Sequence, residues 1–276
     1  MNRVIETGEA RIAYERVGNG APVLLVQGAG VVGAGWRPQV AALRDRYTLV
    51  SWDNRGIGAS TFRTKRLSIE DMAADALAIA DAEGFDRFHV VGHSMGGLIA
   101  QQLALTSPSR VLSLAFLCTF LQGRQAARLT WDMFVTALRT RIGTRAMRRE
   151  AFARLVMPDD YLAQADRTRM FAELAVLFGR DLAEQPAIVM KQVAAMSRFD
   201  VSGRLGQLAA IPSLVMTASL DRIALPVYGR ALAAALPGSR FVEVPGAGHG
   251  VTIQYADKVN ALLAEHWSTA PAAAAP

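Results

Sequence analysis

The sequence predicts an α/β protein with a mostly parallel, doubly wound sheet and an inserted helical cap. Strand-like and helical segments alternate along the chain, which is typical of a parallel sheet covered on both faces. Between residues 122 and 204 the alternation stops and no strand-like run occurs. The length of 276 residues suits one large domain or a core with an insertion. We therefore expect a core over 1–121 and 205–268, a helical cap over 122–204 and a flexible Ala/Pro-rich tail over 269–276.

The chain before the predicted cap begins with a β-hairpin around Thr7-Gly8-Glu9. Apolar runs bounded by turn residues then predict strands that are buried on both faces. We expect strands over 3–6, 11–16, 23–26, 47–52, 88–91 and 112–117, and helices over 68–83 and 95–105. Ser68 is the expected N-cap of the first helix, with Asp71 in place of the usual Glu or Gln and Gly84 as the stop.

The same alternation resumes after the predicted cap, with strands over 213–217 and 241–244 and helices over 227–235 and 255–267. Within the cap, apolar residues recur at helical spacing, as at Met170, Leu174 and Phe178. The cap also holds six of the ten methionines. Because methionine adapts to irregular apolar shapes, these side chains indicate either the cap's own core or a lining for a bulky substrate.

The composition excludes several classes of protein. With 51% hydrophobic and 20% charged residues, the chain is unlike a disordered protein, a collagen or a coiled coil. No apolar run approaches the roughly 20 residues of a membrane span, and the segment from Met1 to Glu6 lacks the apolar stretch of a signal peptide. The single cysteine, Cys118, is expected to be buried and inert. We expect a cytoplasmic protein without a membrane partner.

The net charge of +6 raises the question of a nucleic-acid partner. Residues 122–204 contain 14 basic and 9 acidic side chains, so most of the surplus belongs to the predicted cap. Six arginines there have only Glu150 as an acidic neighbour in the sequence: Arg139, Arg141, Arg145, Arg148, Arg149 and Arg154. Such a cluster favours a solvated helix face over an entrance to the active site that attracts anions. The cluster has no aromatic side chains on which bases could stack, so we expect no nucleic-acid partner.

The motif Gly92-His93-Ser94-Met95-Gly96 lies between a predicted strand and a predicted helix. This is G-x-S-x-G in the context that a nucleophile requires. The tight turn holds the serine above the sheet at the amino terminus of a helix, where backbone N–H groups favour an anionic intermediate. Ligands of open parallel sheets bind beyond the carboxyl ends of the strands, where this turn lies.

A serine nucleophile needs a base and an orienting carboxylate. Of the four histidines, His89 lies inside a strand, His266 lies in the last helix, and His93 adjoins Ser94 and is expected to point elsewhere. His249 directly follows the last strand and is therefore the candidate base. The candidate acid is Asp221, which follows the strand over 213–217.

Over residues 1–267 the chain resembles the α/β-hydrolase family. The order Ser94, Asp221, His249 matches the family order, and the segments 53–60 and 246–249 match further family motifs. The resemblance implies an oxyanion hole formed by the backbone N–H groups of Met95 and Ala29, with Gly30 as an alternative to Ala29. At Gln27 the chain departs from many relatives, which carry histidine there.

A second motif favours a different class of protein. Gly28-Ala29-Gly30-Val31-Val32-Gly33 is a literal G-x-G-x-x-G after a strand, with Asp53 twenty residues beyond the last glycine. A dinucleotide site also needs a helix that begins within the motif, and the following residues 33–38, which include Pro38, oppose an immediate helix. We therefore expect an oxyanion loop, with no cofactor and no metal.

These observations predict a serine hydrolase that cleaves a carboxylic ester or lactone through an acyl-enzyme intermediate. A bulky lipophilic substrate, such as a macrolide-like ester, is one candidate. A carbon–carbon bond hydrolase or an acyltransferase would use the same triad, and a ligand-binding protein on a hydrolase scaffold is an alternative from another class. The expected partner is the small-molecule substrate, and the chain is expected to be a monomer or a homodimer.

Overall fold

The computed structural model describes residues 2–64, 66–128 and 130–270. Its centre is a nine-stranded sheet in the order β1-β2-β4-β3-β6-β7-β8-β9, with β5 paired to β2. The strands β1 and β2 are antiparallel, whereas β4, β3, β6, β7, β8 and β9 are parallel to one another. The strands are β1 (Asn2–Thr7), β2 (Ala10–Val17), β3 (Ala21–Val26), β4 (Tyr47–Trp52), β5 (Thr61–Phe62), β6 (Phe88–His93), β7 (Val111–Leu117), β8 (Ser213–Ala218) and β9 (Arg240–Val244).

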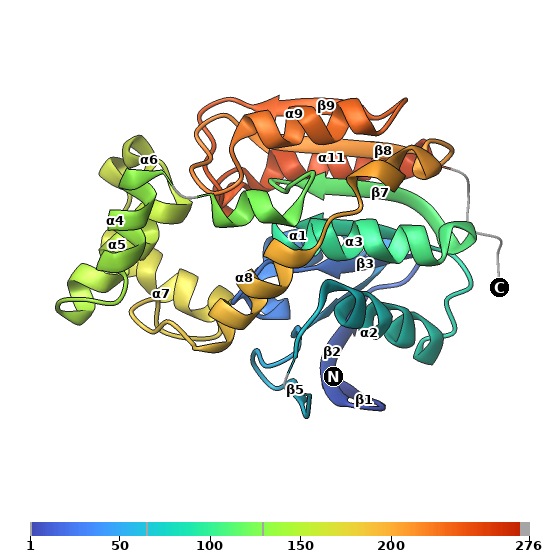
Figure 1. The fold of residues 1–276 in the computed structure, drawn as a ribbon, viewed down its shortest axis with the longest axis horizontal. Coiled ribbons are helices and arrows are strands. Elements are labelled where there is room, and N and C mark those ends of the chain that lie inside the picture. Colours follow the sequence, from blue (N-terminus) through green and yellow to red (C-terminus); the bar gives the residue numbers. More distant parts are fainter. Residues whose placement is uncertain (1, 65, 129, 271–276) are drawn as a thin grey trace.

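Helices cover both faces of this sheet (Figure 1). On one face, α2 packs against α3, and both α3 and α9 contact the 3₁₀ helix η4 (Ser202–Leu208). On the other face, α1 packs against α11. These helices are α1 (Arg37–Leu43), α2 (Ile69–Ala82), α3 (Met95–Thr106), α9 (Pro226–Ala235) and α11 (Ala256–Ser268). The prediction of a doubly wound, mostly parallel sheet is confirmed.

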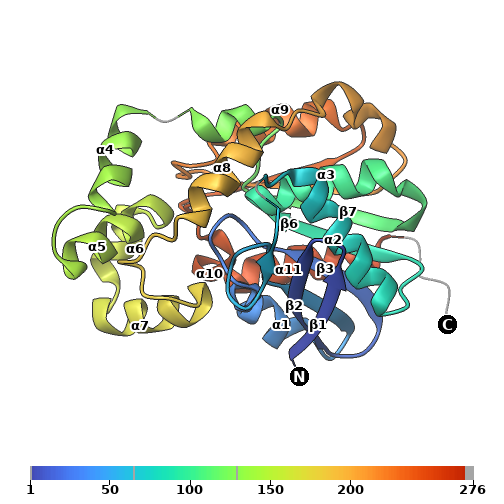
Figure 2. The same cartoon turned by 60° about the horizontal axis from the view of Figure 1, so that its bottom comes forward.

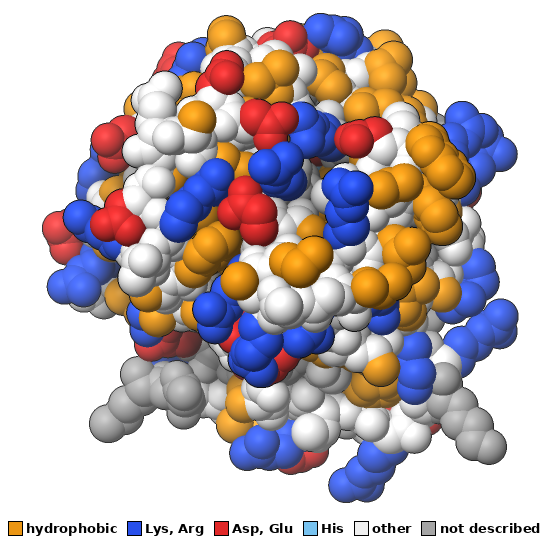
Figure 3. All heavy atoms as spheres, turned by 90° about the vertical axis from the view of Figure 1, so that its left-hand side faces the viewer, with side chains coloured by type: hydrophobic (Ala, Val, Ile, Leu, Met, Phe, Trp, Pro, Cys, Tyr) orange, Lys and Arg blue, Asp and Glu red, His pale blue; other side chains and the backbone are white. Residues whose placement is uncertain are grey.

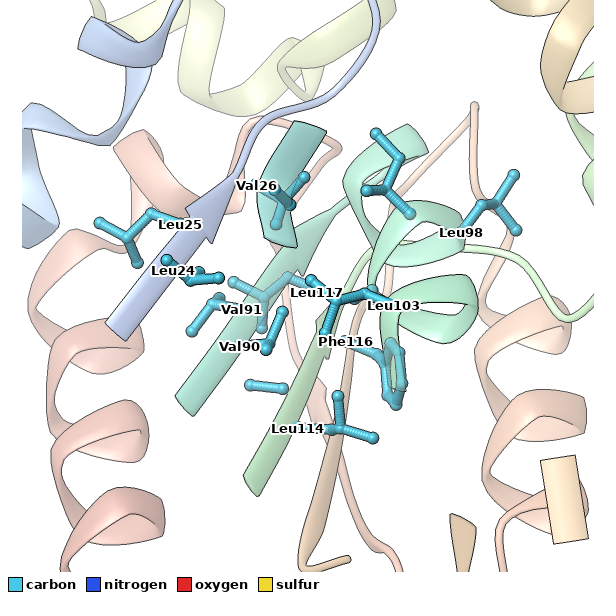
Figure 4. Packing of buried hydrophobic residues seen from close by; sticks show 14 of the residues in the cluster. Leu24, Leu25, Val26, Val90, Val91, Leu98, Leu103, Leu114, Phe116 and Leu117 are labelled. Carbon is cyan, nitrogen blue, oxygen red and sulfur yellow. The ribbon is translucent and has the colours of Figure 1, made fainter. Parts of the chain in front are cut away.

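The core lies between the central strands and these helices. β4, β6, β7 and β8 are buried along their whole length. Figure 4 shows the aliphatic side chains of β3, β6 and β7 meeting those of α3. Burial on both faces explains why these strands are continuous apolar runs in the sequence.

The segment 122–204, which we call the cap, contains five helices, of which four lie at one end of the molecule and the last returns along the main body (Figures 1 and 2). They are α4 (Trp131–Arg139), α5 (Arg145–Val156), α6 (Asp159–Gln164), α7 (Arg167–Phe178) and α8 (Ile188–Arg198). The cap has its own apolar cluster, which includes Met157, Met170, Leu174 and Phe178. Both ends of the segment 122–204 join the main body: Met196 and Phe199 pack in the main core, and the N–H of Gly123 donates to the Phe199 carbonyl.

Acidic side chains lie among the basic ones on the outer face of the cap (Figure 3). Asp181, from beyond α7, pairs with both Arg145 and Arg149. Glu150 pairs with Arg154 and Arg167. Glu150 is the acidic neighbour of this arginine cluster in the sequence, and folding adds Asp181 from a distant part of the segment. These pairs fit the interpretation of a solvated helix face.

Two differences between the predicted and the observed elements lie beside the loops of the candidate site. The last predicted helix, 255–267, corresponds to α11, and a short helix that was not predicted, α10 (Val251–Gln254), precedes it. A 3₁₀ helix, η1 (Gly33–Trp36), begins where we expected no helix and leads directly into α1. That expectation is wrong because Pro38 occupies the first turn of α1, where no intrahelical N–H is needed.

Other expectations hold at the level of single residues. The Ser68 hydroxyl accepts the N–H of Asp71 at the start of α2, and Gly84 follows the helix with a positive φ of 68°. Within the described ranges, no helix is long and apolar enough to cross a membrane. Most of the predicted tail, 269–276, lies outside the described residues.

Candidate active site

Ser94 lies in a strained turn between β6 and α3. Its backbone has φ 54° and ψ −119°, a region that residues with side chains rarely adopt. The flanking glycines permit this turn, since a Cβ on Gly92 would lie 2.3 Å from the Gly96 carbonyl oxygen and one on Gly96 would lie 2.1 Å from that of Val26. The glycines of G-x-S-x-G are thus required by close backbone packing beneath the serine.

His249 and Asp221 meet above the carboxyl ends of the neighbouring strands. Nδ1 of His249 lies 2.8 Å from Oδ2 of Asp221. The other carboxylate oxygen, Oδ1, accepts the backbone N–H groups of Ile223 and Ala224 at 2.8 and 2.9 Å. Asp221 is therefore held on both oxygens, and its bond to Nδ1 leaves Nε2 of His249 free to accept a proton. Ser94, Asp221 and His249 are 6%, 3% and 7% exposed.

His93, the neighbour of the serine, packs beside His249. The two ring centroids are 4.8 Å apart, and Nε2 of His93 is 2.9 Å from the carbonyl oxygen of His249. Burial lowers the pKa of His93 to about 3, so the ring is neutral and Nε2–H donates to this carbonyl. His93 therefore supports the loop that carries His249. Within the described part of the chain, the Ser94 hydroxyl and the His249 ring form no direct hydrogen bond.

The loop after β3 supplies the second part of the candidate oxyanion hole. The Gly28 N–H donates to Oε1 of Gln27 at 2.9 Å, and the Gly30 N–H donates to Oε1 of Gln192 at 2.8 Å. Because Gly30 already donates elsewhere, it is a poor oxyanion donor, and Ala29 is the better candidate in this loop. Met95 is the first residue of α3, and the first N–H groups of a helix have no intrahelical acceptor.

Gln27, where many relatives carry histidine, has a structural role in the same loop. Its side chain folds back onto the Gly28 N–H, and its backbone carbonyl accepts Nδ2 of Asn54 at 3.0 Å. Gly28 lies against the nucleophile, since a Cβ there would be 3.1 Å from the Ser94 Cβ. Gln27 thus helps to place the loop beside the serine.

Asp53 also has structural partners. Its two carboxylate oxygens accept the backbone N–H groups of Gly33 and Ala59, at 2.8 and 2.9 Å. The carboxylate that would bind a ribose hydroxyl in a dinucleotide site is therefore engaged by the protein itself. The G-x-G-x-x-G segment is explained as a loop that Asp53 ties to the strand β4.

The cap covers the candidate site from two sides. At the α5–α6 corner, the Val156 carbonyl accepts the Gly250 N–H at 2.8 Å, next to His249. On the other side, Arg180 donates from Nη1 to the Gly30 carbonyl while Gln192 accepts the Gly30 N–H. Burial lowers the pKa of Arg180. These contacts join the cap to the loop that carries His249 and to the candidate oxyanion loop.

Sequence reasoning missed Arg180 and Gln192. Gln192 carried one signal: it occupies a position on the buried stripe of α8 that also contains Ala195 and Met196, where an apolar residue is expected. Arg180 carried none, because it was one of many arginines in the cap. Only the fold reveals that both side chains meet at Gly30.

Two further residue types were considered for chemistry. Cys118 is fully buried, and both burial and the neighbouring Asp221 carboxylate raise the pKa of its thiol. The thiol is therefore protonated and suited to packing. Across the described residues, no three His, Cys, Asp or Glu side chains are grouped so that they could hold a metal ion.

Comparison with known proteins agrees with this architecture. A protein of Klebsiella pneumoniae named as a candidate carbamate hydrolase, RutD, is 32% identical over 247 residues, or 88% of this chain and 90% of the relative. The solved enol-lactonase from Burkholderia xenovorans superposes with a TM-score of 0.79 at 24% identity, covering 96% of this chain and 100% of that one. A thermophilic esterase from Thermogutta terrifontis gives a TM-score of 0.77 at 24% identity, covering 96% and 97%.

A family model described as the alpha/beta hydrolase fold matches residues 21–254, which is most of the chain. The match includes the G-x-S-x-G turn, the candidate acid and the candidate base. The chain belongs to the α/β-hydrolase fold family.

Proposed function

We propose that this protein is a serine hydrolase that cleaves a carboxylic ester or lactone through an acyl-enzyme intermediate. The observation that carries the proposal is the 2.8 Å contact between His249 Nδ1 and Asp221 Oδ2, formed above the strained turn that presents Ser94. A histidine base that is oriented by a buried carboxylate, together with a serine hydroxyl as nucleophile, is the arrangement that acyl transfer requires.

In the proposed reaction, Ser94 Oγ attacks the carbonyl carbon while Nε2 of His249 takes the hydroxyl proton. Asp221 stabilises the resulting imidazolium. The N–H groups of Ala29 and Met95 bind the oxyanion, and loss of one such donor typically costs about 3 kcal/mol of transition-state stabilisation. His249 then protonates the leaving alcohol, and water activated by the same histidine releases the acid.

A carbamate is the second candidate substrate. It is favoured by the 32% identity to a protein named as a candidate carbamate hydrolase, and its carbonyl carbon can be attacked by the same machinery. A bulky lipophilic substrate has less support, because Met157 and Met170 belong to the cap's own apolar cluster. The exposed Met147 and Met190 are 60% and 56% accessible to solvent.

Two measurements test the proposal. A fluorophosphonate probe should form a covalent adduct on Ser94 of the folded protein, found by mass spectrometry of the labelled peptide. The wild-type protein should hydrolyse members of a panel of p-nitrophenyl esters, lactones and aryl carbamates, and Ser94→Ala should remove that activity. No adduct, or unchanged turnover in Ser94→Ala, would show that Ser94 is not the nucleophile. Preference for carbamates over esters would select the second candidate substrate.

A further inference from the structure

The helix α8 presents one face to the loops that surround Ser94. A Cβ on Gly56 would lie 2.7 Å from Ile188, and one on Gly30 would lie 2.8 Å from Val189. Gln192 lies one turn further along this face, because residues three and four apart are neighbours on a helix. It is 0% exposed. The cap therefore brings a buried carboxamide to the candidate oxyanion loop.

The hydrogen bond to Gly30 determines how this carboxamide is oriented. The Gly30 N–H is a donor, so the atom that faces it at 2.8 Å must be the carbonyl oxygen, Oε1. The NH₂ group on the same carbon then also lies beside the loop. Nε2 is buried without a hydrogen-bond partner among the described residues. A buried donor left unpaired costs about 1–3 kcal/mol, and a substrate oxygen that accepts from Nε2 would offset this cost.

We infer that Gln192 binds the substrate by donating from Nε2 to an oxygen of the acyl group. This inference rests on the proposed function, since it takes Ala29 as the donor to the reacting carbonyl. Gly30 follows Ala29 directly, so Gln192 lies one residue beyond the oxyanion donor. Ala29 takes the carbonyl oxygen itself, so we assign the acceptor to another oxygen of the acyl group.

The two sides of the cap indicate which half of the substrate Gln192 contacts. The leaving group must lie near His249, which protonates it, and that side is covered by the α5–α6 corner through the contact between Gly250 and Val156. Gln192 belongs to α8, which covers the oxyanion loop instead. We therefore assign Gln192 to the acyl half. The preferred substrates carry an ether, hydroxyl or carbonyl oxygen on the carbon next to the reacting carbonyl.

A pair of esters of nearly equal size tests this assignment. p-Nitrophenyl methoxyacetate carries an oxygen where p-nitrophenyl butyrate carries a methylene. The ratio of their kcat/KM values is measured for the wild type and for Gln192→Met, which keeps the length of the side chain and removes both polar atoms. The comparison of ratios cancels the higher intrinsic reactivity of the methoxyacetate. We expect the ratio to fall about fivefold to tenfold in the variant, as for loss of one hydrogen bond.

Lys191→Met is the matched control, because Lys191 is the exposed neighbour of Gln192 on the same helix, and it should leave the ratio unchanged. If Gln192→Met does not fold, Gln192→Glu at pH 8 replaces it: a carboxylate still accepts the Gly30 N–H but has no donor. Equal loss of activity on both esters would overturn the inference, because Gln192 would then act only by positioning Gly30.

Fluorophosphonate labelling separates this outcome from failure of the proposed function. If wild-type Ser94 is labelled and both esters are hydrolysed, but the ratio is the same in wild type and variant, only the assignment of Gln192 is wrong. If the wild type is neither labelled nor active on either ester, the proposed function and the inference fall together.

Discussion

Asp221 holds His249 through Oδ2 while Oδ1 is held by two backbone N–H groups, those of Ile223 and Ala224. The carboxylate therefore cannot rotate without losing three hydrogen bonds. Its position determines which nitrogen of His249 carries the proton, and that choice decides whether Nε2 can act as a base.

Asp221→Asn tests this relationship. The amide oxygen can still accept the N–H groups of Ile223 and Ala224, which leaves NH₂ facing Nδ1 of His249. The imidazole must then carry its proton on Nε2, and kcat should fall by about 10³ to 10⁴-fold, as for other triads with the wrong tautomer. Ester hydrolysis gives kcat, and an unchanged thermal midpoint shows that the fold is intact. A loss below tenfold would contradict the assigned role of Asp221.

The strained backbone at Ser94 predicts a difference in stability between two inactive variants, Ser94→Gly and Ser94→Ala. With φ 54° and ψ −119°, a residue with a side chain costs about 1–3 kcal/mol that glycine avoids, partly offset by the greater freedom of glycine in the unfolded chain. Ser94→Gly should therefore be about 1 kcal/mol more stable than Ser94→Ala in urea unfolding, although both are inactive. Equal stabilities would argue that the turn is not strained.

A buried ion pair secures the loop that follows β4. Nε and Nη2 of Arg55 lie 2.6 and 2.9 Å from the Asp75 carboxylate, and the two side chains are 6% and 2% exposed. Asp75→Asn leaves the buried guanidinium with only the more exposed Asp71 carboxylate, 3.9 Å away, as a counter-charge, and should destabilise the protein by about 3 kcal/mol. Denaturant unfolding measures the change. Glu265→Gln, which breaks the exposed pair with Arg240, is the control and should cost less than about 1 kcal/mol.

Buried histidines predict how stability depends on pH. Burial lowers the pKa of His89 to about 4 and that of His93 to about 3, against about 6.5 in an unfolded chain. Between pH 6.5 and pH 4 the unfolded state binds protons that the native state does not. Stability should therefore fall as the pH decreases, by up to about 1.4 kcal/mol per pH unit for each histidine.

The variant His89→Asn checks this dependence, since Asn can replace Nδ1 as the partner of the Ser113 hydroxyl, which lies 2.8 Å away. Unfolding free energies are measured in urea between pH 7 and pH 4.5. The variant should show a shallower slope than the wild type. The same slope in both proteins would mean that His89 is protonated in the native state.

Arg180 couples the cap to the candidate oxyanion loop through the Gly30 carbonyl. Arg180→Met removes a charge-assisted hydrogen bond that is typically worth about 1.5–3 kcal/mol. We expect kcat/KM for esters to fall about tenfold or more and the cap to become more sensitive to limited proteolysis. Arg180→Lys should recover part of both properties. Normal activity in Arg180→Met would show that the loop keeps its position without the cap.

The sequence by itself predicted most of the strands and helices of the core, because strands buried on both faces must be continuous apolar runs and helix ends carry local signals such as Ser68. It also identified the candidate nucleophile, since G-x-S-x-G is a motif of five neighbouring residues between a strand and a helix. The candidate acid and base followed from their places directly after strands whose carboxyl ends share one edge of the sheet.

Only the tertiary structure decided which groups actually meet. Asp181 reaches Arg145 and Arg149, and Gln192 reaches Gly30, across long separations in the chain that no periodic pattern records. The helices η1 and α1 were not expected because Pro38 was taken as a sign against a helix, although proline is tolerated in a helix's first turn. A motif such as G-x-S-x-G can be read from neighbouring residues. The contacts between the cap and the loops of the candidate site join residues that are far apart in the sequence, so they exist only after the cap has folded onto the sheet.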